Sequence, residues 1–211
     1  MKYIRLLPLF LIGMFLTACD HKPPVKQDVF PWQIKLLQNG GSQVFGMTLA
    51  ETRLFEAEQK LGRQAEVALF EDARGLSLEA YFDSLLLGGL KCRMILTLRT
   101  TTELVSQLRD ESVQHEPTST GAYKYRLAGQ ARQDIRKLKI DAITYIPSVN
   151  LDEELVRLRF GEPDNILRLN ETETRFIYQT KGLLLILNAR GKDVLQYVHP
   201  QDFERLRLNA Q

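Results

Sequence analysis

The side chains that could carry chemistry are few in this 211-residue chain, and they lie far apart along it. The thiols are Cys19 and Cys92, and the imidazoles are His21, His115 and His199. No histidine has another histidine, a cysteine or paired acids at the spacing of metal ligands, so a zinc site has little support. The sequence also lacks the Gly-x-Ser-x-Gly motif and the glycine-rich phosphate loops. We therefore expect no catalytic residue, no metal site and no cofactor.

Carboxylates are more numerous, but their positions have structural explanations. Asp152, Glu153 and Glu154 occupy the first turn of a predicted helix, where negative charge complements the helix dipole. Glu171 and Glu173 lie between two predicted strands, as acids of a hairpin turn do. A glycosidase would need two carboxylates about 5 to 10 Å apart in a cleft. An unrecognised hydrolase is therefore kept as an alternative that only a suitable pocket would support.

The first 20 residues contain the clearest pattern in the sequence. Lys2 and Arg5 precede an uncharged run at residues 6–18. This run is shorter than the about 20 apolar residues of a membrane-spanning helix, and it is typical of an export signal. The four residues Leu16-Thr17-Ala18-Cys19 resemble the lipobox of bacterial lipoproteins. The alternatives are an ordinary secretory signal that happens to contain the cysteine, or a short buried helix.

The lipobox resemblance implies a specific modification. In lipoproteins the cysteine sulfur receives a diacylglycerol and the peptidase cuts just before it, so the resemblance implies cleavage between Ala18 and Cys19 and lipidation of Cys19. Two or more lipid chains anchor a protein stably, whereas one holds it only marginally. Asp20 resembles the sorting signal that retains lipoproteins in the inner membrane. We therefore expect the periplasmic face of the inner membrane, with the outer membrane as the alternative.

The charge balance argues against a nucleic-acid partner. The chain has 28 Lys and Arg against 26 Asp and Glu, and cleavage after residue 18 would remove Lys2 and Arg5 and make the two numbers equal. Nucleic-acid binding relies on clustered cations that neutralise phosphates. The densest basic stretch, at residues 132–139, contains Asp134 and is typical of a solvated helix face.

The remainder of the chain divides into parts with a similar order of elements. Residues 19–30 contain a proline pair and predict a tether, and the polar residues 111–121 predict a linker. The linker separates residues 31–110 from residues 122–211. We therefore expect an α+β protein of two similar units, each with short helices packed on a small antiparallel β-sheet. The alternative is one continuous α+β domain.

Capping pairs and apolar alternation locate the elements of each unit. Thr48 and Glu51 predict the start of a helix that ends at Gly62, and Asn150 and a glutamate three residues later predict a helix that ends at Gly161. Cys92 lies in a predicted strand, where we expect it to be buried. Further strands are predicted at 31–37, 65–70, 76–83, 91–98, 123–127, 143–147, 165–169 and 174–179, and closing helices at 101–109 and 201–208.

The second unit resembles a known family. The helix that ends in Phe160-Gly161-Glu162-Pro163, followed by a strand with Phe176-Ile177-Tyr178, is similar to the SmpA/OmlA-type (BamE-like) envelope lipoproteins. The resemblance covers mainly residues 145–198 and more faintly residues 44–98. It implies a fold that recurs in tandem in β-lactamase inhibitory proteins, in a family that includes an accessory subunit of the outer-membrane protein assembly machine.

Two leucine-rich runs, at residues 85–87 and 183–187, break the alternation of a sheet with one wet face. Both faces of these strands should be covered, either within the protein or by a partner protein or an acyl chain. We therefore expect a lipid-anchored interaction or scaffold module of the bacterial envelope, without catalysis. Its expected partners are the membrane, through the anchor, and an envelope protein. A periplasmic small-ligand or lipid-binding lipoprotein is the alternative.

Overall fold

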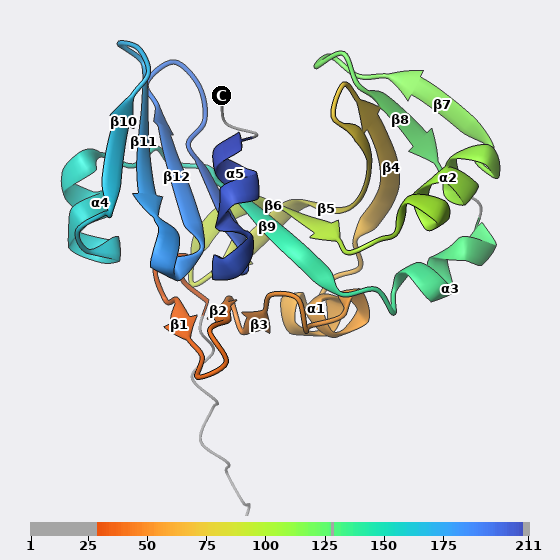
Figure 1. The fold of residues 1–211 in the computed structure, drawn as a ribbon, viewed down its shortest axis with the longest axis horizontal. Helices are drawn as coiled ribbons and strands as arrows, with labels where there is room; N and C mark the ends of the chain where they lie inside the picture. Colours follow the sequence, from red (N-terminus) through yellow and green to blue (C-terminus); the bar gives the residue numbers. More distant parts are fainter. Residues whose placement is uncertain (1–28, 128, 209–211) are drawn as a thin grey trace, which may run out of the picture.

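The computed structural model describes residues 29–127 and 129–208, and its main element is one antiparallel sheet of ten strands (Figure 1). Its strands are β4 (Glu66–Asp72), β5 (Gly75–Leu87), β6 (Leu90–Leu98), β7 (Gln114–Pro117), β8 (Tyr123–Arg126), β9 (Ile140–Pro147), β10 (Asn165–Arg168), β11 (Glu173–Tyr178), β12 (Leu183–Asn188) and β13 (Val194–Val198). They lie in the order β10-β11-β12-β13-β9-β6-β5-β4-β8-β7.

The remaining elements are short. A second sheet contains β1 (Lys35–Leu36), β2 (Ser42–Val44) and β3 (Met47–Thr48). The helices are α1 (Leu54–Leu61), α2 (Thr102–Asp110), α3 (Arg132–Ile135), α4 (Glu153–Phe160) and α5 (Phe203–Leu208), with 3-10 turns at Gly129–Ala131, Gln179–Lys181 and Pro200–Asp202. Within the part of the chain that the structure describes, no helix has the length and apolar character needed to span a bilayer.

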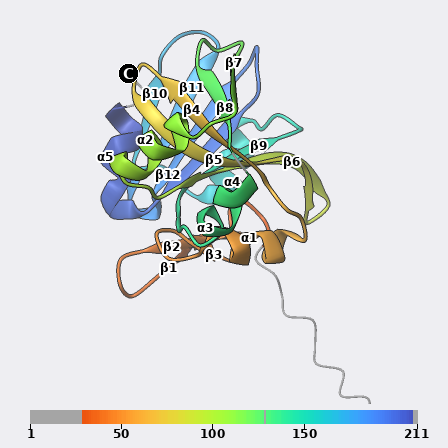
Figure 2. The same ribbon diagram turned by 90° about the vertical axis from the view of Figure 1, so that its right-hand side faces the viewer.

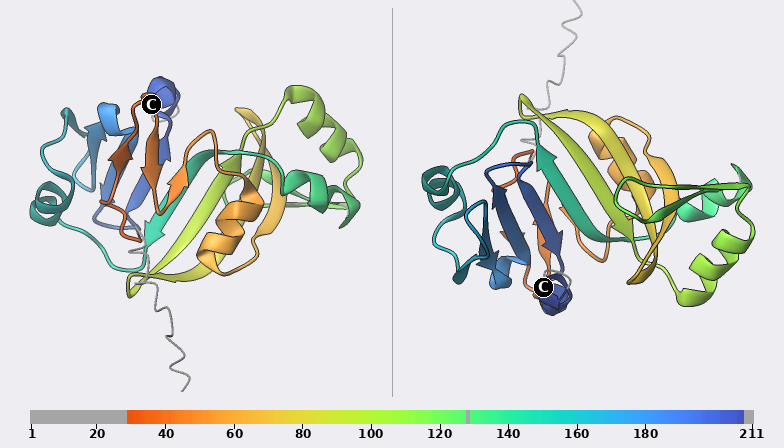
Figure 3. Two further views of the ribbon diagram at one scale, coloured as in Figure 1. Left: turned by 90° about the horizontal axis from the view of Figure 1, so that it is seen from below. Right: turned by 90° about the horizontal axis from the view of Figure 1, so that it is seen from above.

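The large sheet is curved, and its two faces are covered unequally. In Figure 1, β10–β12 rise on one side and β4, β8 and β7 on the other, with β9, β6 and β5 between them. The small sheet and α1 lie below the strands on the convex face (Figures 1 and 3). Side chains of α2, α3 and α4 belong to the same core as those of α1. Among the helices of the described residues, only α5 lies on the concave face, against β11, β12 and β13.

The main core lies on the convex side because the strand residues alternate between the two faces. On β5, Leu78 and Phe82 are buried in this core, whereas Glu79 and Tyr81 point to the concave face. The same alternation on β6 and β9 buries apolar side chains on one face and leaves polar and half-buried apolar side chains on the other. The strand pattern therefore determines which residues line the concavity.

A second, smaller core lies under α5. Phe203 and Leu206 of α5 pack on Ile177, Leu184 and Val198, which come from three neighbouring strands. The expectation that both faces of the leucine runs are covered is therefore confirmed for β12, where the closing helix covers the second face. This contact holds α5 within the concavity. The expectation is wrong for β5, where Leu86 is exposed.

The expected division into two similar α+β units is wrong. The protein is mostly β, and β6 pairs with β9 from Cys92 opposite Pro147 to Leu98 opposite Ile140, so that one sheet crosses the supposed boundary. The physical reason is that β6 and β9 both carry a continuous apolar face, and pairing them covers two edges at once. Local alternation reveals such strands but does not reveal which edges meet.

The segment expected to be a linker, residues 111–121, contains β7. This strand pairs with β8, and β8 pairs in turn with β4, from Leu69 opposite Tyr125 to Glu71 opposite Tyr123. A strand assigned to the second unit thus extends the sheet at strands of the first. The polar composition of this segment does not predict a strand, because an edge strand with exposed faces needs no apolar pattern.

The helix ends were predicted better than the helix starts. Gly62 and Gly161 end α1 and α4 with positive φ angles of 65° and 80°, as expected. Thr48, however, lies in β3, where its hydroxyl accepts a hydrogen bond from Gln43, and α1 begins six residues later. The α4 cap is Asp152, which accepts the backbone N–H of Leu155 at 2.7 Å, and not Asn150.

Two glycines with almost equal φ angles allow a test of how tightly the sheet packs. Gly182 (φ 66°) and Gly62 (φ 65°) are both left-handed, but a Cβ at residue 182 would lie 2.1 Å from the Val198 carbonyl oxygen, whereas one at residue 62 meets nothing within 4 Å. We expect Gly62→Ala to lower the free energy of unfolding by about 1–2 kcal/mol. Gly182→Ala should cost about 1–3 kcal/mol more because of the clash. Equal urea midpoints for the two variants would contradict this packing.

Candidate functional site

A groove of about 320 Å³ lies on the concave face of the large sheet, between the β4–β5 turn and α5. We call it the concave groove. Its floor consists of small or polar side chains from β5, β6, β9 and β13, and its walls carry charges. The floor residues are Ser77, Glu79, Thr97, Ala142, Thr144, Gln196 and Val198; the walls include Asp72 and Arg74 on one side and Asp141, Arg205 and Leu206 on the other.

The strand register brings the floor residues together. Glu79 lies opposite Thr97 across β5 and β6, and Thr97 lies opposite Ala142 across β6 and β9. Thr144 lies opposite Gln196 across β9 and β13. Directly opposed residues on one face of a sheet have Cβ atoms about 4.5–5.5 Å apart, so these side chains form one continuous polar surface.

Glu79 is the titratable group at the floor of the groove. Ser77 Oγ donates a hydrogen bond to Glu79 Oε1 at 3.1 Å. Burial raises the pKa of Glu79, and the Ser77 hydroxyl and the charge of Arg74 oppose the rise. The Ser77 hydroxyl and the Glu79 carboxyl can both form hydrogen bonds with a ligand in the groove.

The wall beside α5 is a network of four charged side chains. Asp141 of β9 accepts Arg99 at 2.7 Å and Arg205 of α5 at 3.1 Å, and Asp202 accepts the same Arg205 at 3.0 Å. Only 15% of the Asp141 side chain is exposed, so two arginines share one largely covered carboxylate. Such multiple contacts fix the orientation of a helix better than an isolated surface pair does. The network therefore holds α5 at the border of the groove.

The opposite wall is the turn between β4 and β5. Arg74 there donates to Asp72 through its side chain, with an Nη2–Oδ2 distance of 2.6 Å. The same contact holds the pKa of Asp72 below its usual value. The Arg74 side chain is 66% exposed, so the pair is largely solvated and can rearrange when a ligand binds.

Toward the β5–β6 turn the concave face changes from polar to apolar. Ile95, Ile146, Ile186 and Val194 are half-buried there, and the exposed Arg93 lies opposite Ile146 on the same face. Tyr81 is also half-buried on this face. The concave face thus combines a groove with hydrogen-bonding groups and an apolar strip beside it.

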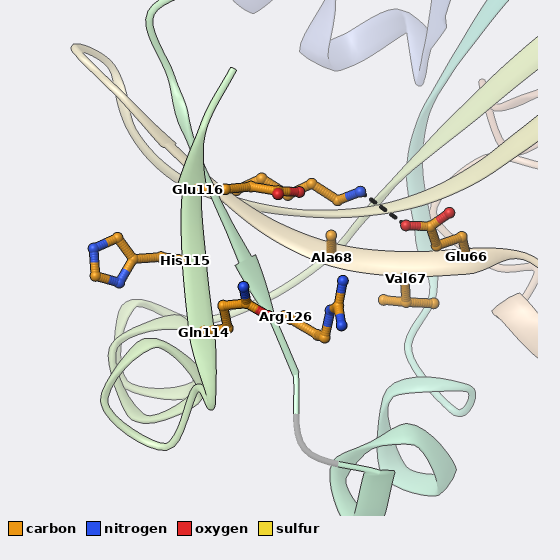
Figure 4. Close-up of a pocket in the computed structure, with 8 residues that line it drawn as sticks. Glu66, Val67, Ala68, Gln114, His115, Glu116 and Arg126 are labelled. Atoms are coloured by element: carbon orange, nitrogen blue, oxygen red, sulfur yellow. Dashed lines mark hydrogen bonds and ion pairs between the residues drawn. The ribbon is translucent and has the colours of Figure 1, made fainter.

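A smaller pocket of about 30 Å³ lies between β4, β7 and β8, at the edge of the sheet (Figure 4). Lys124 Nζ contacts Glu66 Oε1 at 2.8 Å across this pocket. Glu116 and Arg126 add charges of both signs, and His115 points away from Glu66 (Figure 4). The His115 ring lies 5.5 Å from the Tyr125 ring. The pocket is a patch of charged side chains in which one ion pair is already formed.

The structure places the other candidate residues apart from one another. Cys92 is buried, as expected, and burial raises the pKa of its thiol to about 11, so it is a packing residue. His199 Nδ1 accepts the Gln201 backbone N–H and caps the turn before α5. Among residues 29–127 and 129–208 no three His, Cys, Asp or Glu side chains gather to hold a metal. Ala18, Cys19, Asp20 and His21 lie outside the described residues.

The groove residues were not identified from the sequence. Thr97, Thr144 and Gln196 are ordinary polar residues at alternate positions of strands, and such positions usually face solvent. Their importance depends on the pairing of β6 with β9 and on the position of α5. The polar positions of the predicted strands 76–83, 91–98 and 143–147 could have been aligned, but only with the correct strand order. Gln196 lies outside the predicted strands.

The raised pKa of Glu79 predicts a pH-dependent contribution to stability. A carboxyl with a higher pKa in the folded state binds more protons there, so its contribution to stability falls as pH rises through the pKa of the unfolded chain. The glutamine of Glu79→Gln does not titrate, so the variant lacks this fall in stability with rising pH. The free energy of unfolding of the variant, minus that of the native protein, should therefore increase between pH 4 and pH 7 in urea titrations. A difference that stays constant or decreases would show that Glu79 has no raised pKa.

Comparisons with known proteins gave no match: no family model, curated protein or solved structure is similar to this chain. The resemblances to the lipobox and to the SmpA/OmlA-type lipoproteins therefore stay predictions from the residues. The site is defined by its geometry on the concave face.

Proposed function

We propose that this protein is a lipid-anchored binding module of the bacterial envelope, attached through Cys19 at the periplasmic face of the inner membrane. Its concave face binds a segment of an envelope protein. The observation that carries the proposal is a set of polar side chains on the groove floor, Thr97, Thr144 and Gln196, that form no hydrogen bond within the described residues. The lipobox pattern at residues 16–19 supports the anchor.

The groove floor has hydrogen-bonding groups that are not committed to the fold. The side chains of Thr97, Thr144 and Gln196 form no hydrogen bond with any residue in the described part of the chain. A ligand that covers such groups must supply matching donors and acceptors, because an unpaired buried polar group costs about 1–3 kcal/mol. The groups stand on paired strands, which hold them in place before binding. The floor therefore suits a partner with its own polar groups.

The composition of the concave face favours a polypeptide over a small apolar ligand. Small-molecule sites are mostly enclosed and apolar, whereas this groove is open and has a polar floor. Protein interfaces contain both apolar and polar groups, and Ile95, Ile146, Ile186 and Val194 add an apolar area beside the polar floor. We infer that the bound segment carries both apolar and hydrogen-bonding side chains.

The N-terminal side of the described chain leaves the concave face free. Tyr197, whose ring is in the main core, donates a hydrogen bond to the Pro31 carbonyl oxygen at 2.8 Å. Trp32 also packs against that core. The chain is therefore joined to the fold on the convex side. A tether there would confine the module to a thin layer beside the bilayer and raise its effective concentration for membrane-bound partners.

One feature favours the small-ligand alternative. An apolar pocket lies between Trp32, Leu90, Val149 and α4, and its lining is almost free of polar groups. Its volume is about 30 Å³, so a ligand would have to widen it. A copurifying lipid in native mass spectra of the intact protein would support that function.

The anchor can be tested directly. Cells that produce the full chain should incorporate an alkyne fatty acid into it, because the Cys19 sulfur receives the diacylglycerol. Cys19→Ser should lose the label, whereas Cys92→Ser should keep it, since Cys92 is buried in the core. Fractionation should find the native protein with the membranes. An unlabelled native chain, or one among cytosolic solutes, would exclude the anchor.

The binding face can be tested by photocrosslinking in the anchored full chain. A photoreactive amino acid at position 144 should give a discrete crosslinked species, and the same group at position 158 should not. Leu158 is a suitable control because it is 74% exposed on α4, away from the concave face. Thr97→Arg should reduce the crosslink from position 144 by roughly tenfold, as loss of a central interface contact does. Leu158→Arg should leave it unchanged. Equal products from positions 144 and 158 would contradict the proposal.

A further inference from the structure

Two large apolar side chains are exposed at one end of the sheet. Leu86, next to the β5–β6 turn, is 72% exposed, and Val149, just after β9, is 60% exposed. In the same hairpin Leu85 is buried, so the leucine run of β5 is covered on one face only. Figure 2 shows this hairpin projecting from one side of the molecule.

These side chains surround the tip of one hairpin, on both faces of the sheet. Leu86 and Lys91 point to the concave face, whereas Leu90 points to the convex side. The backbone N–H of Ser148 donates to the Lys91 carbonyl oxygen at 3.0 Å and ties the loop after β9 to the hairpin. Leu86 lies opposite Lys91 in that hairpin. Val149, Leu90 and Trp32 line the same apolar pocket. We call the surface made by Phe30, Trp32, Leu86, Leu90 and Val149 the hairpin patch.

The N-terminal side of the chain joins the fold at this patch. The Phe30 ring lies directly over Gly88, because a Cβ at residue 88 would be 2.5 Å from it. Phe30 also stacks on Trp32, with ring centroids 4.9 Å apart. Ten Cα–Cα steps separate Cys19 from Val29, and an extended chain covers at most about 3.5 Å per step, or roughly 35 Å in all. A lipid on Cys19 would therefore keep the patch close to the bilayer.

Cations surround the hairpin patch. Lys91 is exposed, Lys192 Nζ donates to the Ser148 carbonyl oxygen at 3.1 Å, and the Arg159 guanidinium lies 4.9 Å from the centre of the Trp32 ring. None of these three pairs with an acid of the described residues. Apolar side chains together with unpaired cations are typical of surfaces that bind anionic membranes.

The geometry points to a contact between the hairpin patch and an anionic lipid bilayer. Leu86 and Val149 enter the headgroup region, and Lys91, Arg159 and Lys192 meet the lipid phosphates. This inference rests on the proposed lipid anchor, since one weak surface signal needs a second to hold a protein on a membrane. The contact fixes the orientation that a tether alone leaves free.

The orientation has a consequence for the concave groove. Lys91 and Thr97 lie six residues apart on β6, so the groove floor stands roughly 20 Å from the patch along the strand. With the patch on the bilayer, the groove floor would stand at about that height above the headgroups. Figure 3 shows the hairpin at one extremity of the molecule, with α2 at the far end.

The experiment uses the full chain, purified with its anchor and placed in vesicles of phosphatidylethanolamine and phosphatidylglycerol. A cysteine is introduced by Leu86→Cys and labelled with an environment-sensitive dye, and Val113→Cys serves as the control. Val113 is 69% exposed between α2 and β7, away from the hairpin. The native thiols do not interfere, because Cys92 is buried and the Cys19 sulfur is a thioether once lipidated.

We expect brominated lipids to quench the dye at position 86 at least threefold more than the dye at position 113. Adding Lys91→Glu and Lys192→Glu should reduce the quenching at position 86 by at least twofold in these vesicles. Equal quenching at the two positions would overturn the inference. So would a change at position 86 that depends on protein concentration and not on brominated lipid, because a second copy would then cover the patch. Fatty-acid labelling of the same sample distinguishes a missing anchor from a missing contact.

Discussion

The pairing of β6 with β9 is the contact on which the rest of the structure depends. Both strands are central, both bury apolar side chains on the convex face, and their register runs from Cys92 opposite Pro147 to Leu98 opposite Ile140. Without this contact the sheet would separate into two smaller sheets with exposed edges. With it, side chains from both halves of the chain share one main core and one concave face. The concave groove exists only because Thr97 of β6 and Thr144 of β9 are brought onto that face.

Much of the local structure could be predicted from the sequence. Alternation located most of the strands of the large sheet, Gly62 and Gly161 marked the ends of two helices, and the burial of Cys92 followed from its strand. These features depend on residues close together in the chain. The similar order of elements in the two halves predicted two units, but a similar order does not require separate sheets, and the strands form one. Strand order and register depend on edges far apart in sequence, and single-sequence patterns contain little information about them.

The groove could not be predicted for the same reason. Its floor combines side chains from four strands, and its wall needs α5 to lie on the concave face, where Phe203 and Leu206 cover the apolar side chains of β11, β12 and β13. Each of these residues is unremarkable in its own segment. The two faces of the sheet therefore differ in composition: the convex face carries the main core, and the concave face carries the second core and the polar side chains of the groove. The apolar strip next to the groove lets one surface offer both kinds of contact.

The hydrogen bond from Tyr197 to Pro31 joins residues 166 positions apart, and α5 is built from residues 203–208. The first described residues thus stay without their packing partners until almost the whole polypeptide has been made. A chain still emerging from the ribosome or from an export channel can form the β5–β6 hairpin, but it cannot close the core or complete the groove wall. Contacts of such long range also slow folding. Completion of the concave groove is therefore a late event in folding, and a chain truncated before α5 would lack one wall of the groove.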